Sequence, residues 1–335
     1  MVATLTEVAR KADVSLATAS RAFSDPDRLA PATRDRVLST ALELHYEAPL
    51  PRGSRTFAVV VPDVANAVFA ELIRSIQEQA WHGRHRMILS HTAEDPAREK
   101  EILGSFGRGV DGVILASPRL AQSAIKAAIG STPLVLINLE TEFAPSVLLD
   151  VEEGMRQAVE HLDALGHRKI AYVPGPASSW ANQRRLQCIT DLAAEWDIEL
   201  IKVGNQSATI DGGLAAAASV VCSGATAVVA FNDLVALGVQ AGARTLGYHC
   251  PEHLSVVGID DLDVGAASEP GLTSIRTAIA RSGSLTLELL LDQIAGTQVP
   301  NKAVHLGSQL IVRGSTFAAR NPVADDNPNP GRRVS

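Results

Sequence analysis

Residues 4–23 read TLTEVARKADVSLATASRAF, and this stretch decides how the N-terminal part of the chain folds. Thr4 and Glu7 have the spacing of a capping box, in which each side chain accepts a hydrogen bond from the other residue's backbone N–H. A helix can therefore begin after Thr4 and run to about Ala12. Its apolar residues recur at helical spacing, which favours a short amphipathic helix over a strand.

A tight turn at Asp13 separates this helix from a second one. Asp tolerates the left-handed backbone better than most residues, and Ser15 is a favourable N-cap for a helix over Leu16–Phe23. A third helix is expected from about Pro31 to Leu44. The first two helices can share an inner cluster of Val8, Ala9, Val14, Ala19 and Phe23. Two helices joined by so short a turn and braced by a third predict a helix-turn-helix, which places its second helix in the major groove of DNA.

The second helix carries side chains suited to reading DNA. Arg can make two hydrogen bonds to guanine, small apolar side chains suit the thymine methyl group, and short hydroxyls suit phosphates. The expected base contacts are Leu16, Ala17 and Arg21, and the expected phosphate contacts are Ser15, Thr18 and Ser20. Spacing alone fits an ordinary helical hairpin with a solvated Arg21 equally well.

The N-terminal stretch resembles the DNA-binding signature of the lactose-repressor (LacI/GalR) family. The similarity continues through Thr33–Leu38 and Glu43–Tyr46. The chain departs from the family pattern at Asp13, Ala19, Phe23 and His45. None of these departures removes an expected base contact. The resemblance implies a homodimer or higher oligomer that binds a pseudo-palindromic double-stranded operator and that more often represses than activates transcription.

The segment after this stretch, residues 48–56, departs most from the family pattern. In the family a short hinge helix inserts a leucine into the minor groove and kinks the DNA. Here Pro49, Pro51 and Gly53 oppose a helix, and Leu50, the one candidate wedge, precedes a proline. We therefore expect that the protein bends DNA little or docks its DNA-binding heads differently, with a merely flexible tether as the alternative. The candidates for phosphate contacts in this segment are Arg52 and Arg55.

From Phe57 onward, short apolar runs typical of buried strands alternate with amphipathic stretches long enough for helices. Such alternation predicts parallel, doubly wound α/β sheets, and because the pattern restarts near Asp150 we expect two Rossmann-like lobes. The expected strands are Phe57–Val61, Met87–Ser90, Gly112–Ala116, Leu134–Ile137, Ser146–Leu149, Ile170–Val173, Glu199–Val203, Ala227–Phe231 and Ser255–Ile259. Most of these strands are separated by stretches long enough for helices, such as Phe69–His82, Glu152–Leu165, Arg184–Trp196 and Leu234–Leu246.

This part resembles the periplasmic-binding-protein type I fold, which the same family uses as its sensor. Landmarks of the resemblance are Val110–Leu115, Phe231–Asp233 and Ser255–Asp261. It implies a last helix, about Ala278 to Ile294, that returns to the first lobe. The implied domains are a DNA-binding domain at 1–47, a linker at 48–56, and a sensor at 57–318 whose lobes are about 57–149 plus 278–307 and about 150–277 plus 308–318. The remaining tail at 319–335 is rich in Pro, Asn and Asp, which predicts disorder.

Ligands of such sheets bind at the carboxyl ends of strands, here in the cleft between lobes. A sugar needs paired donors and acceptors for its hydroxyls and an apolar face for its ring. By resemblance, Arg185, Asn232 and Asp260 match the family's effector contacts. Asn232 could instead cap a helix, Asp260 could satisfy a turn, and Trp180, in the loop before Arg185, could pack locally. The full set of candidate effector contacts is Phe69, Asn138, Trp180, Arg185, Asn232, Asp260 and Thr277.

Composition narrows the remaining functions. The net charge is −7, but residues 1–56 carry +1 and the rest −8, so the case for DNA binding depends on the motif. Cys188, Cys222 and Cys250 form an odd, widely spaced set, which fits a reducing cytoplasm and no disulfide framework. The N-terminus lacks a signal-peptide pattern, and no apolar run approaches the ~20 residues needed to span a bilayer. We therefore expect a cytoplasmic protein without a membrane segment.

No cofactor, metal or catalytic site is expected. Gly107–Gly112 spells G-x-G-x-x-G but precedes a strand, whereas a dinucleotide loop follows one. His249, Cys250 and His253 lie in one loop without the second cluster typical of zinc sites. The sequence favours a regulator with a sugar-like effector. The alternatives are a regulator responding to a nucleoside or purine, a stand-alone solute-binding protein, and an enzyme acting on a sugar or nucleoside.

Overall fold

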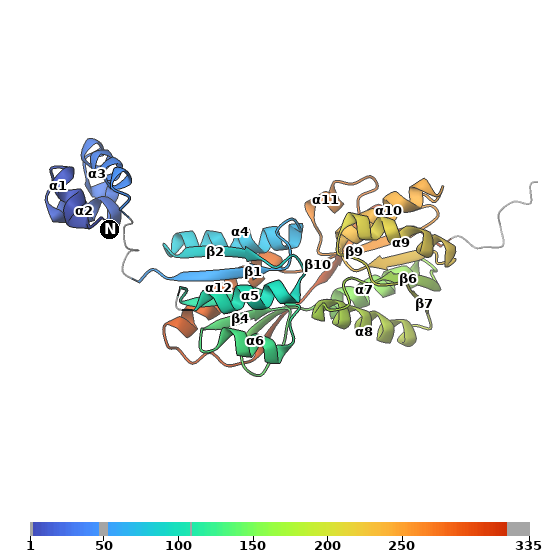
Figure 1. Cartoon of the computed structure of the whole chain (residues 1–335). Coiled ribbons are helices and arrows are strands. Elements are labelled where there is room, and N and C mark those ends of the chain that lie inside the picture. Colours follow the sequence, from blue (N-terminus) through green and yellow to red (C-terminus); the bar gives the residue numbers. More distant parts are fainter. Residues whose placement is uncertain (1–2, 47–52, 108, 320–335) are drawn as a thin grey trace, which may run out of the picture.

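The computed structural model describes residues 3–46, 53–107 and 109–319. Its first helices form a small bundle of their own (Figure 1). They are α1 (Leu5–Lys11), α2 (Leu16–Ser24), the 3-10 turn η1 (Pro26–Arg28) and α3 (Pro31–Glu43). Thr4 and Glu7 form the expected capping box, and Asp13 has a left-handed backbone, with φ of 51°. The short turn therefore forms as the sequence predicts.

The bundle has its own apolar core. Ala9 and Ala19 are almost fully buried, so α1 and α2 approach closely where their side chains are small. The buried members are Val8, Ala9, Ala12, Ala19, Ala22, Val37 and Ala41, with Val14 and Phe23 packed against them. All five residues of the expected inner cluster are present, and the α3 residues Val37 and Ala41 brace it.

The rest of the described chain forms two six-stranded sheets with helices packed around them (Figure 1). The first has the order β11-β5-β4-β3-β1-β2 and is parallel throughout; the second has the order β12-β10-β9-β8-β6-β7, and β12 alone runs antiparallel to its neighbour. The strands of the first sheet are β1 (Thr56–Val61), β2 (Arg86–His91), β3 (Gly112–Ala116), β4 (Leu134–Ile137), β5 (Ser146–Leu149) and β11 (Ala303–Leu306). Those of the second are β6 (Lys169–Val173), β7 (Glu199–Lys202), β8 (Ala227–Ala230), β9 (Ser255–Ile259), β10 (Thr273–Arg276) and β12 (Gln309–Ile311).

Helices cover both faces of each sheet, which explains why the central strands are continuously apolar. On β1, Val59 packs toward α4 and α12, whereas its neighbour Val60 packs toward α5 and α6. The helices of the first lobe are α4 (Ala67–His82), α5 (Pro96–Phe106), α6 (Gln122–Ile129) and α12 (Ile279–Ile294). Those of the second are α7 (Glu152–Ala164), α8 (Trp180–Glu195), α9 (Ile210–Cys222), α10 (Asp233–Thr245) and α11 (Asp263–Ala266).

The chain passes between the two sheets three times. It leaves the first sheet after β5, returns after β10 through α12, and leaves again between β11 and β12. Helix α12 packs against α4 and against β3, β4 and β5, so the last helix does return to the first lobe. The carboxyl ends of the central strands of both sheets consequently border one cleft.

Some expected boundaries were wrong. Helix α8 begins at Trp180 and not near Arg184, because Ser179 caps it by accepting the N–H of Asn182. Strand β1 begins at Thr56, and Arg55 continues its ladder by accepting the N–H of Arg86. The elements expected by residue range from the sequence do not include α5, α6, α9, α11, β10, β11 or β12. None of the described helices combines the length and apolarity needed to cross a membrane.

Candidate functional site

The DNA-facing candidates lie mainly on the exposed side of α2. Leu16 is 52% exposed, and Ala17, Ser20 and Arg21 are exposed as well. Ser15 is the N-cap of α2: its hydroxyl accepts the N–H of Thr18 at 3.0 Å and lies 2.8 Å from the Thr18 hydroxyl. Arg21 forms no ion pair with another described residue. These side chains are therefore placed where a major groove can reach them.

The two candidates from the linker fall in different places. Arg52 lies outside the described residues. Arg55 is half-buried at the entrance to β1, where its backbone N–H donates to Nδ1 of His85 at 3.0 Å. Burial and the nearby Arg55 charge lower the pKa of His85. Arg55 is thus anchored in the first lobe, and its contact with phosphate remains a prediction.

A cleft between the lobes collects most of the expected effector contacts. It holds about 460 Å³ of space including its opening to solvent. Its lining comes from both lobes and comprises Asn66, Val68, Phe69, Glu94, Ser117, Arg119, Asn138, Leu149, Ala181, Arg185, Ala208, Phe231, Asn232 and Asp260. Five of the seven candidates, namely Phe69, Asn138, Arg185, Asn232 and Asp260, belong to this set. The structure brings them together from strand ends and helix starts that are far apart in sequence.

Arg185 and Asp260 form the polar centre of the second-lobe wall. Arg185 lies in the second turn of α8, donates to the Phe231 carbonyl at 2.5 Å, and stacks over the Phe231 ring at 4.7 Å. Its Nη2 lies 3.3 Å from Oδ1 of Asp260, to which Thr277 also donates at 3.4 Å. Burial raises the pKa of Asp260, and the Arg185 guanidinium opposes that rise. The other carboxylate oxygen of Asp260 makes no hydrogen bond with the described residues and can accept one from a ligand.

The backbone around Asp260 is held in an unusual conformation. Asp260 and Asp261 have φ of 108° and 55°, in the region that side chains other than glycine rarely adopt. Asp261 secures this turn by pairing with Nε of Arg276 and Nη2 of Arg313, each at 2.6 Å. Of the two carboxylates, Asp260 therefore faces the cleft and Asp261 fixes the turn.

Asn232 has the structural role that the sequence left open. Its Oδ1 accepts the N–H of Val235 at 2.9 Å and so caps α10, while its Nδ2 donates to the carbonyl of Ala208 at 3.3 Å. It also lines the cleft, so capping and ligand contact are compatible here. The adjacent Asp233 is fully buried, and burial raises its pKa to about 7.

The first-lobe wall is built at the ends of β3 and β4. Asn138 adopts φ of 53°; its Oδ1 accepts the N–H of Leu149 at 3.0 Å, and its Nδ2 lies 3.5 Å from the Ser117 hydroxyl. Phe69, in the first turns of α4, supplies a half-buried aromatic face. This wall therefore presents an amide, a hydroxyl and an apolar ring to the cleft.

Sequence reasoning missed an ion pair on the same wall. The side chain of Arg119 is buried and pairs through Nε with Glu94, while its Nη1 donates to the carbonyl of Ser117 at 2.6 Å. Beneath it the buried Glu99 accepts the backbone N–H of Arg119 at 2.8 Å and that of Leu120 at 3.3 Å. Burial raises the pKa of Glu99 although these N–H groups oppose the rise. The signal that could have found Arg119 is its position just after the expected strand Gly112–Ala116.

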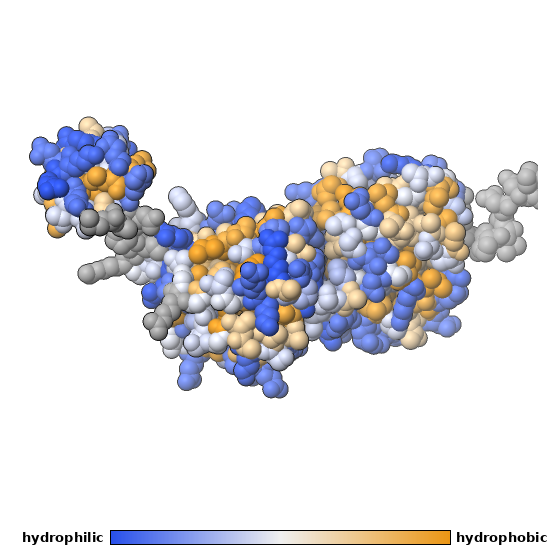
Figure 2. Space-filling model, viewed as in Figure 1, coloured by the Kyte–Doolittle hydropathy of each residue, from blue (hydrophilic) through white to orange (hydrophobic). Residues whose placement is uncertain are grey.

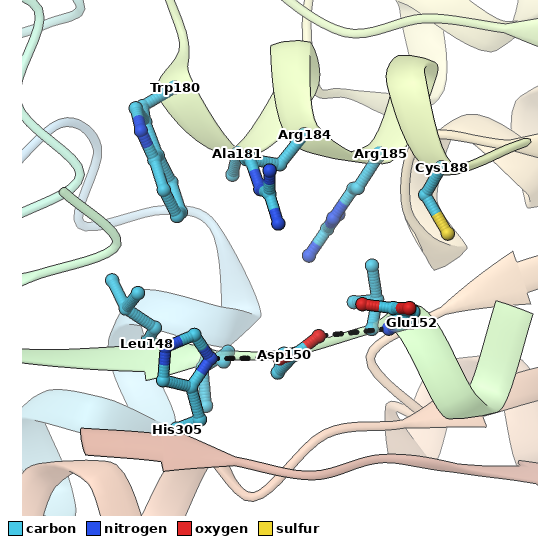
Figure 3. A pocket seen from close by; sticks show the side chains of 11 residues that line it. Leu148, Asp150, Glu152, Trp180, Ala181, Arg184, Arg185, Cys188 and His305 are labelled. Carbon is cyan, nitrogen blue, oxygen red and sulfur yellow. Dashed lines mark hydrogen bonds and ion pairs between the residues drawn. The ribbon is translucent and has the colours of Figure 1, made fainter. Parts of the chain in front are cut away.

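Trp180 does not line the cleft. It begins α8 and lines a neighbouring chamber of about 440 Å³, which shares Leu149, Ala181 and Arg185 with the cleft (Figure 3). Asp150 lies across this chamber and accepts a hydrogen bond from Nδ1 of His305 at 2.9 Å. Burial favours the neutral acid, but the hydrogen bonds from Glu152 and His305 hold the pKa of Asp150 below its usual value. Thr277 supports Asp260 and also lies outside the cleft lining.

Sequence comparison identifies relatives for both parts of the chain. Residues 4–48 match the lacI family of bacterial regulatory proteins, and residues 159–316 match a periplasmic binding protein-like domain. The chain is 32% identical to the HTH-type transcriptional repressor CytR of Escherichia coli (strain K12), covering 94% of this chain and 97% of that protein. It is 31% identical to the HTH-type transcriptional regulator MalR of Streptomyces coelicolor, covering 95% and 98%.

Solved structures agree with these relatives. The lac repressor dimer bound to operator and the anti-inducer ONPF matches with a TM-score of 0.78 and 25% identity, covering 95% of this chain and all of that one. The transcriptional regulator CelR in complex with cellobiose matches with a TM-score of 0.71 and 28% identity, covering 93% and 99%. The expected fold, a helix-turn-helix followed by two periplasmic-binding-protein-like lobes, is confirmed. This chain is a transcription regulator that belongs to the lacI family of bacterial regulatory proteins.

Proposed function

We propose that the chain is a dimeric repressor that binds a pseudo-palindromic operator through α2 and changes its operator affinity when a small sugar-like effector fills the cleft. The observation that carries the proposal is the cleft itself. Asn138 and Phe69 from one lobe face Arg185 and Asp260 from the other across one cavity. A ligand held by both walls fixes the angle between the lobes. A change in that angle alters the spacing of the two DNA-binding bundles in a dimer and so can change operator affinity.

Polar groups and an aromatic face make a sugar the favoured effector class. Arg185 and Asp260 offer a donor and an acceptor for neighbouring hydroxyls, and Phe69 offers an apolar face for a ring. A structural relative, CelR, holds cellobiose, and another lacI-family regulator, from Enterococcus faecium, holds ribose. We propose binding without turnover, and a site of action on the chromosome in the bacterial cytoplasm.

The test begins with selection of genomic fragments by the purified protein at near-physiological salt. Enrichment of one palindrome is expected, and fluorescence anisotropy on that fragment then measures operator affinity with and without a panel of sugars and nucleosides. Coupling must be reciprocal, so a sugar that weakens operator binding must itself bind less tightly when operator is present. A nucleoside that alone changes the affinity would favour the alternative effector class. No enrichment, or no ligand effect, would contradict the proposal.

Replacing Arg21 tests the DNA-reading face. Arg21→Ala is expected to weaken operator binding by about 1–3 kcal/mol, because the exposed guanidinium is the side chain on α2 best suited to a guanine edge. Arg36→Ala removes the same charge from exposed α3 and should have a smaller effect. The measurement is anisotropy on the operator and on single-base variants of it. Undiminished discrimination at every base would show that α2 is not the recognition helix.

The exposed edge of the first sheet is the proposed dimer contact. Ile88 and Leu89 on β2 are 39% and 43% exposed, and Trp81 at the end of α4 is 81% exposed. Figure 2 shows hydrophobic surface over the region of α4 and β2. An unpaired strand edge with exposed apolar side chains is typical of an interface.

A charge placed on this edge should separate the subunits. Leu89→Glu is expected to weaken dimerisation by about 2 kcal/mol or more, since it buries a carboxylate at the contact. Val304→Glu is the matched control, because Val304 is 38% exposed on β11, the opposite edge of the same sheet. Sedimentation equilibrium measures both variants. If the two variants dimerise equally well, the dimer contact does not lie at β2.

A further inference from the structure

Both arginines of the cleft are already paired with carboxylates. Arg119 pairs with Glu94 on the first-lobe wall, and Arg185 pairs with Asp260 on the second-lobe wall. The side chains of Arg119 and Arg185 are only 3% and 7% exposed, so solvent screens these charges weakly. The positive charge of each guanidinium is therefore largely neutralised by the carboxylate paired with it.

These four residues are the only charged members of the described cleft lining, and their formal charges sum to zero. The buried Glu99 beneath Arg119 adds no positive charge in either protonation state. A phosphate group that approached either arginine would meet Glu94 or Asp260 beside it. Repulsion by that carboxylate offsets the attraction that an unpaired arginine would offer to an anion.

Pairing leaves hydrogen-bond donors for an uncharged ligand. Arg119 uses Nε and Nη1, and Arg185 uses Nη1 and Nη2, so Nη2 of Arg119 and Nε of Arg185 make no hydrogen bond with the described residues. A hydroxyl oxygen can accept from such a donor without bringing a charge, and can donate to Asp260. The walls thus suit neutral groups that both donate and accept.

The neighbouring chamber offers no better place for an anion. Arg184 makes no ion pair with the described residues, but it shares that chamber with Asp150 and Glu152 (Figure 3). The charged side chains that line this chamber, apart from His305, are Asp150, Glu152, Arg184 and Arg185, and their formal charges sum to zero. A phosphate on a ligand held in the cleft therefore has no net positive pocket on this side either.

We propose that the cleft selects an uncharged polyhydroxy ligand and rejects its phosphorylated counterpart, with Glu94 as the specificity-determining residue because it neutralises Arg119. This inference rests on the proposed function in one respect, namely that the effector occupies this cleft. The cleft is expected to accept sugars and nucleosides and to reject sugar phosphates and nucleotides. Glu94, in the loop before α5, produces this selectivity through its charge, since a carboxylate supplies no hydrogen-bond donor to the ligand.

Inorganic phosphate and ribose 5-phosphate test the inference without knowledge of the effector. By isothermal titration calorimetry, the wild-type protein is expected to bind neither at up to about 10 mM. Glu94→Gln leaves Arg119 unpaired and should bind both at least about tenfold more tightly. The double variant Glu94→Gln, Arg119→Gln should lose that binding again. Glu195→Gln is the matched control, since it breaks the exposed Arg156–Glu195 pair, which is not part of the cleft lining, and should behave as wild type.

Two outcomes would overturn the inference. One is wild-type binding of phosphate that disappears in Arg119→Gln; the other is a correctly folded Glu94→Gln, checked by circular dichroism, that gains no phosphate binding. Either can occur while an uncharged sugar still changes operator affinity, in which case the proposed function stands and the selectivity fails. If no ligand changes operator affinity but Glu94→Gln gains phosphate binding, the charge argument stands and the proposed function fails.

Discussion

Gly238→Ala is expected to destabilise the second lobe by roughly 3 kcal/mol. A Cβ at position 238 would lie 2.1 Å from the carbonyl oxygen of Ile210 and 2.8 Å from the Cα of Gly213. Both are backbone atoms of the α9 segment, so no side-chain rotation can make room. Gly213 faces the reverse problem, since its Cβ would lie 2.1 Å from the carbonyl oxygen of Val235 in α10. The two helices pack backbone to backbone only because both positions are glycine.

The matched control is another glycine in a helix. Gly104→Ala in α5 places a Cβ where no atom lies within 4 Å. Alanine is the better helix former by about 0.5–1 kcal/mol, so this variant should be neutral or slightly more stable. Urea unfolding followed by circular dichroism measures both free energies. Equal unfolding free energies for the two variants would show that α9 and α10 can separate without cost.

Gly238→Ala should also weaken ligand binding. The carbonyl of Ala208 and the amide of Asn232 meet at the adjacent starts of α9 and α10, and both residues line the cleft. Forcing the helices apart therefore moves part of the second-lobe wall. A loss of stability without any loss of ligand affinity would mean that these helix starts do not shape the site.

Local signals in the sequence predicted those elements whose stability is itself local. The caps at Thr4, Ser15 and Asn232 form as their residue types require, and the central strands are apolar on both faces because helices cover both faces. Helix α9 gave no such signal. Its sequence, IDGGLAAAASVVC, has little contrast between polar and apolar sides, because the side that packs on α10 is made of glycine and alanine. The edge strand β11 was missed since it is short and half exposed.

The site was predictable where sheet geometry alone determines it. Asn138, Asn232 and Asp260 each follow a strand of a parallel sheet, and the carboxyl ends of such strands converge. The Glu94–Arg119 pair is set by the conformations of two separate loops, which no local pattern reports. Trp180 was misplaced for a related reason: the cap at Ser179 starts α8 earlier than its apolar periodicity suggests and turns the indole into the neighbouring chamber.

Asp233→Asn is expected to change how stability depends on pH. Asp233 is fully buried at the start of α10 and accepts hydrogen bonds from the Ser274 hydroxyl at 2.5 Å and from the N–H of Leu262 at 2.7 Å. Burial raises its pKa to about 7 from an ordinary value of 3.8, even though these hydrogen bonds favour the ionised form. The folded protein therefore holds the proton more tightly than the unfolded chain does.

The sign follows from this difference in proton affinity. Below the unfolded pKa both states are protonated, and the stabilisation from the tighter proton is complete; it is lost as the pH rises through about 7. A difference of about three pKa units between the folded and unfolded states corresponds to roughly 4 kcal/mol of unfolding free energy. Asn cannot titrate, so the unfolding free energy of wild type relative to Asp233→Asn should fall by roughly that amount between about pH 4 and pH 8.

The difference between the two proteins must be measured, because the wild-type curve contains opposing contributions. Burial lowers the pKa of His85, His161 and His167, and a lowered pKa removes stability as the pH falls below the usual histidine range. Urea unfolding of both proteins across the pH range removes these shared contributions. Parallel curves would show that Asp233 does not hold its proton more tightly in the folded state.

Ser274→Ala separates the effect of burial from that of hydrogen bonding. The Ser274 hydroxyl donates to Asp233 and so favours the ionised form. Without it, the pH range over which stability is lost should move upward, whereas an effect of packing alone would leave that range in place.

The position of Asp233 gives this titration a consequence for function. It follows the cleft residue Asn232 and holds the N–H of Leu262, two residues after Asp260. Ionisation near neutral pH should therefore change the ligand affinity of wild type over the same pH range and leave that of Asp233→Asn unchanged.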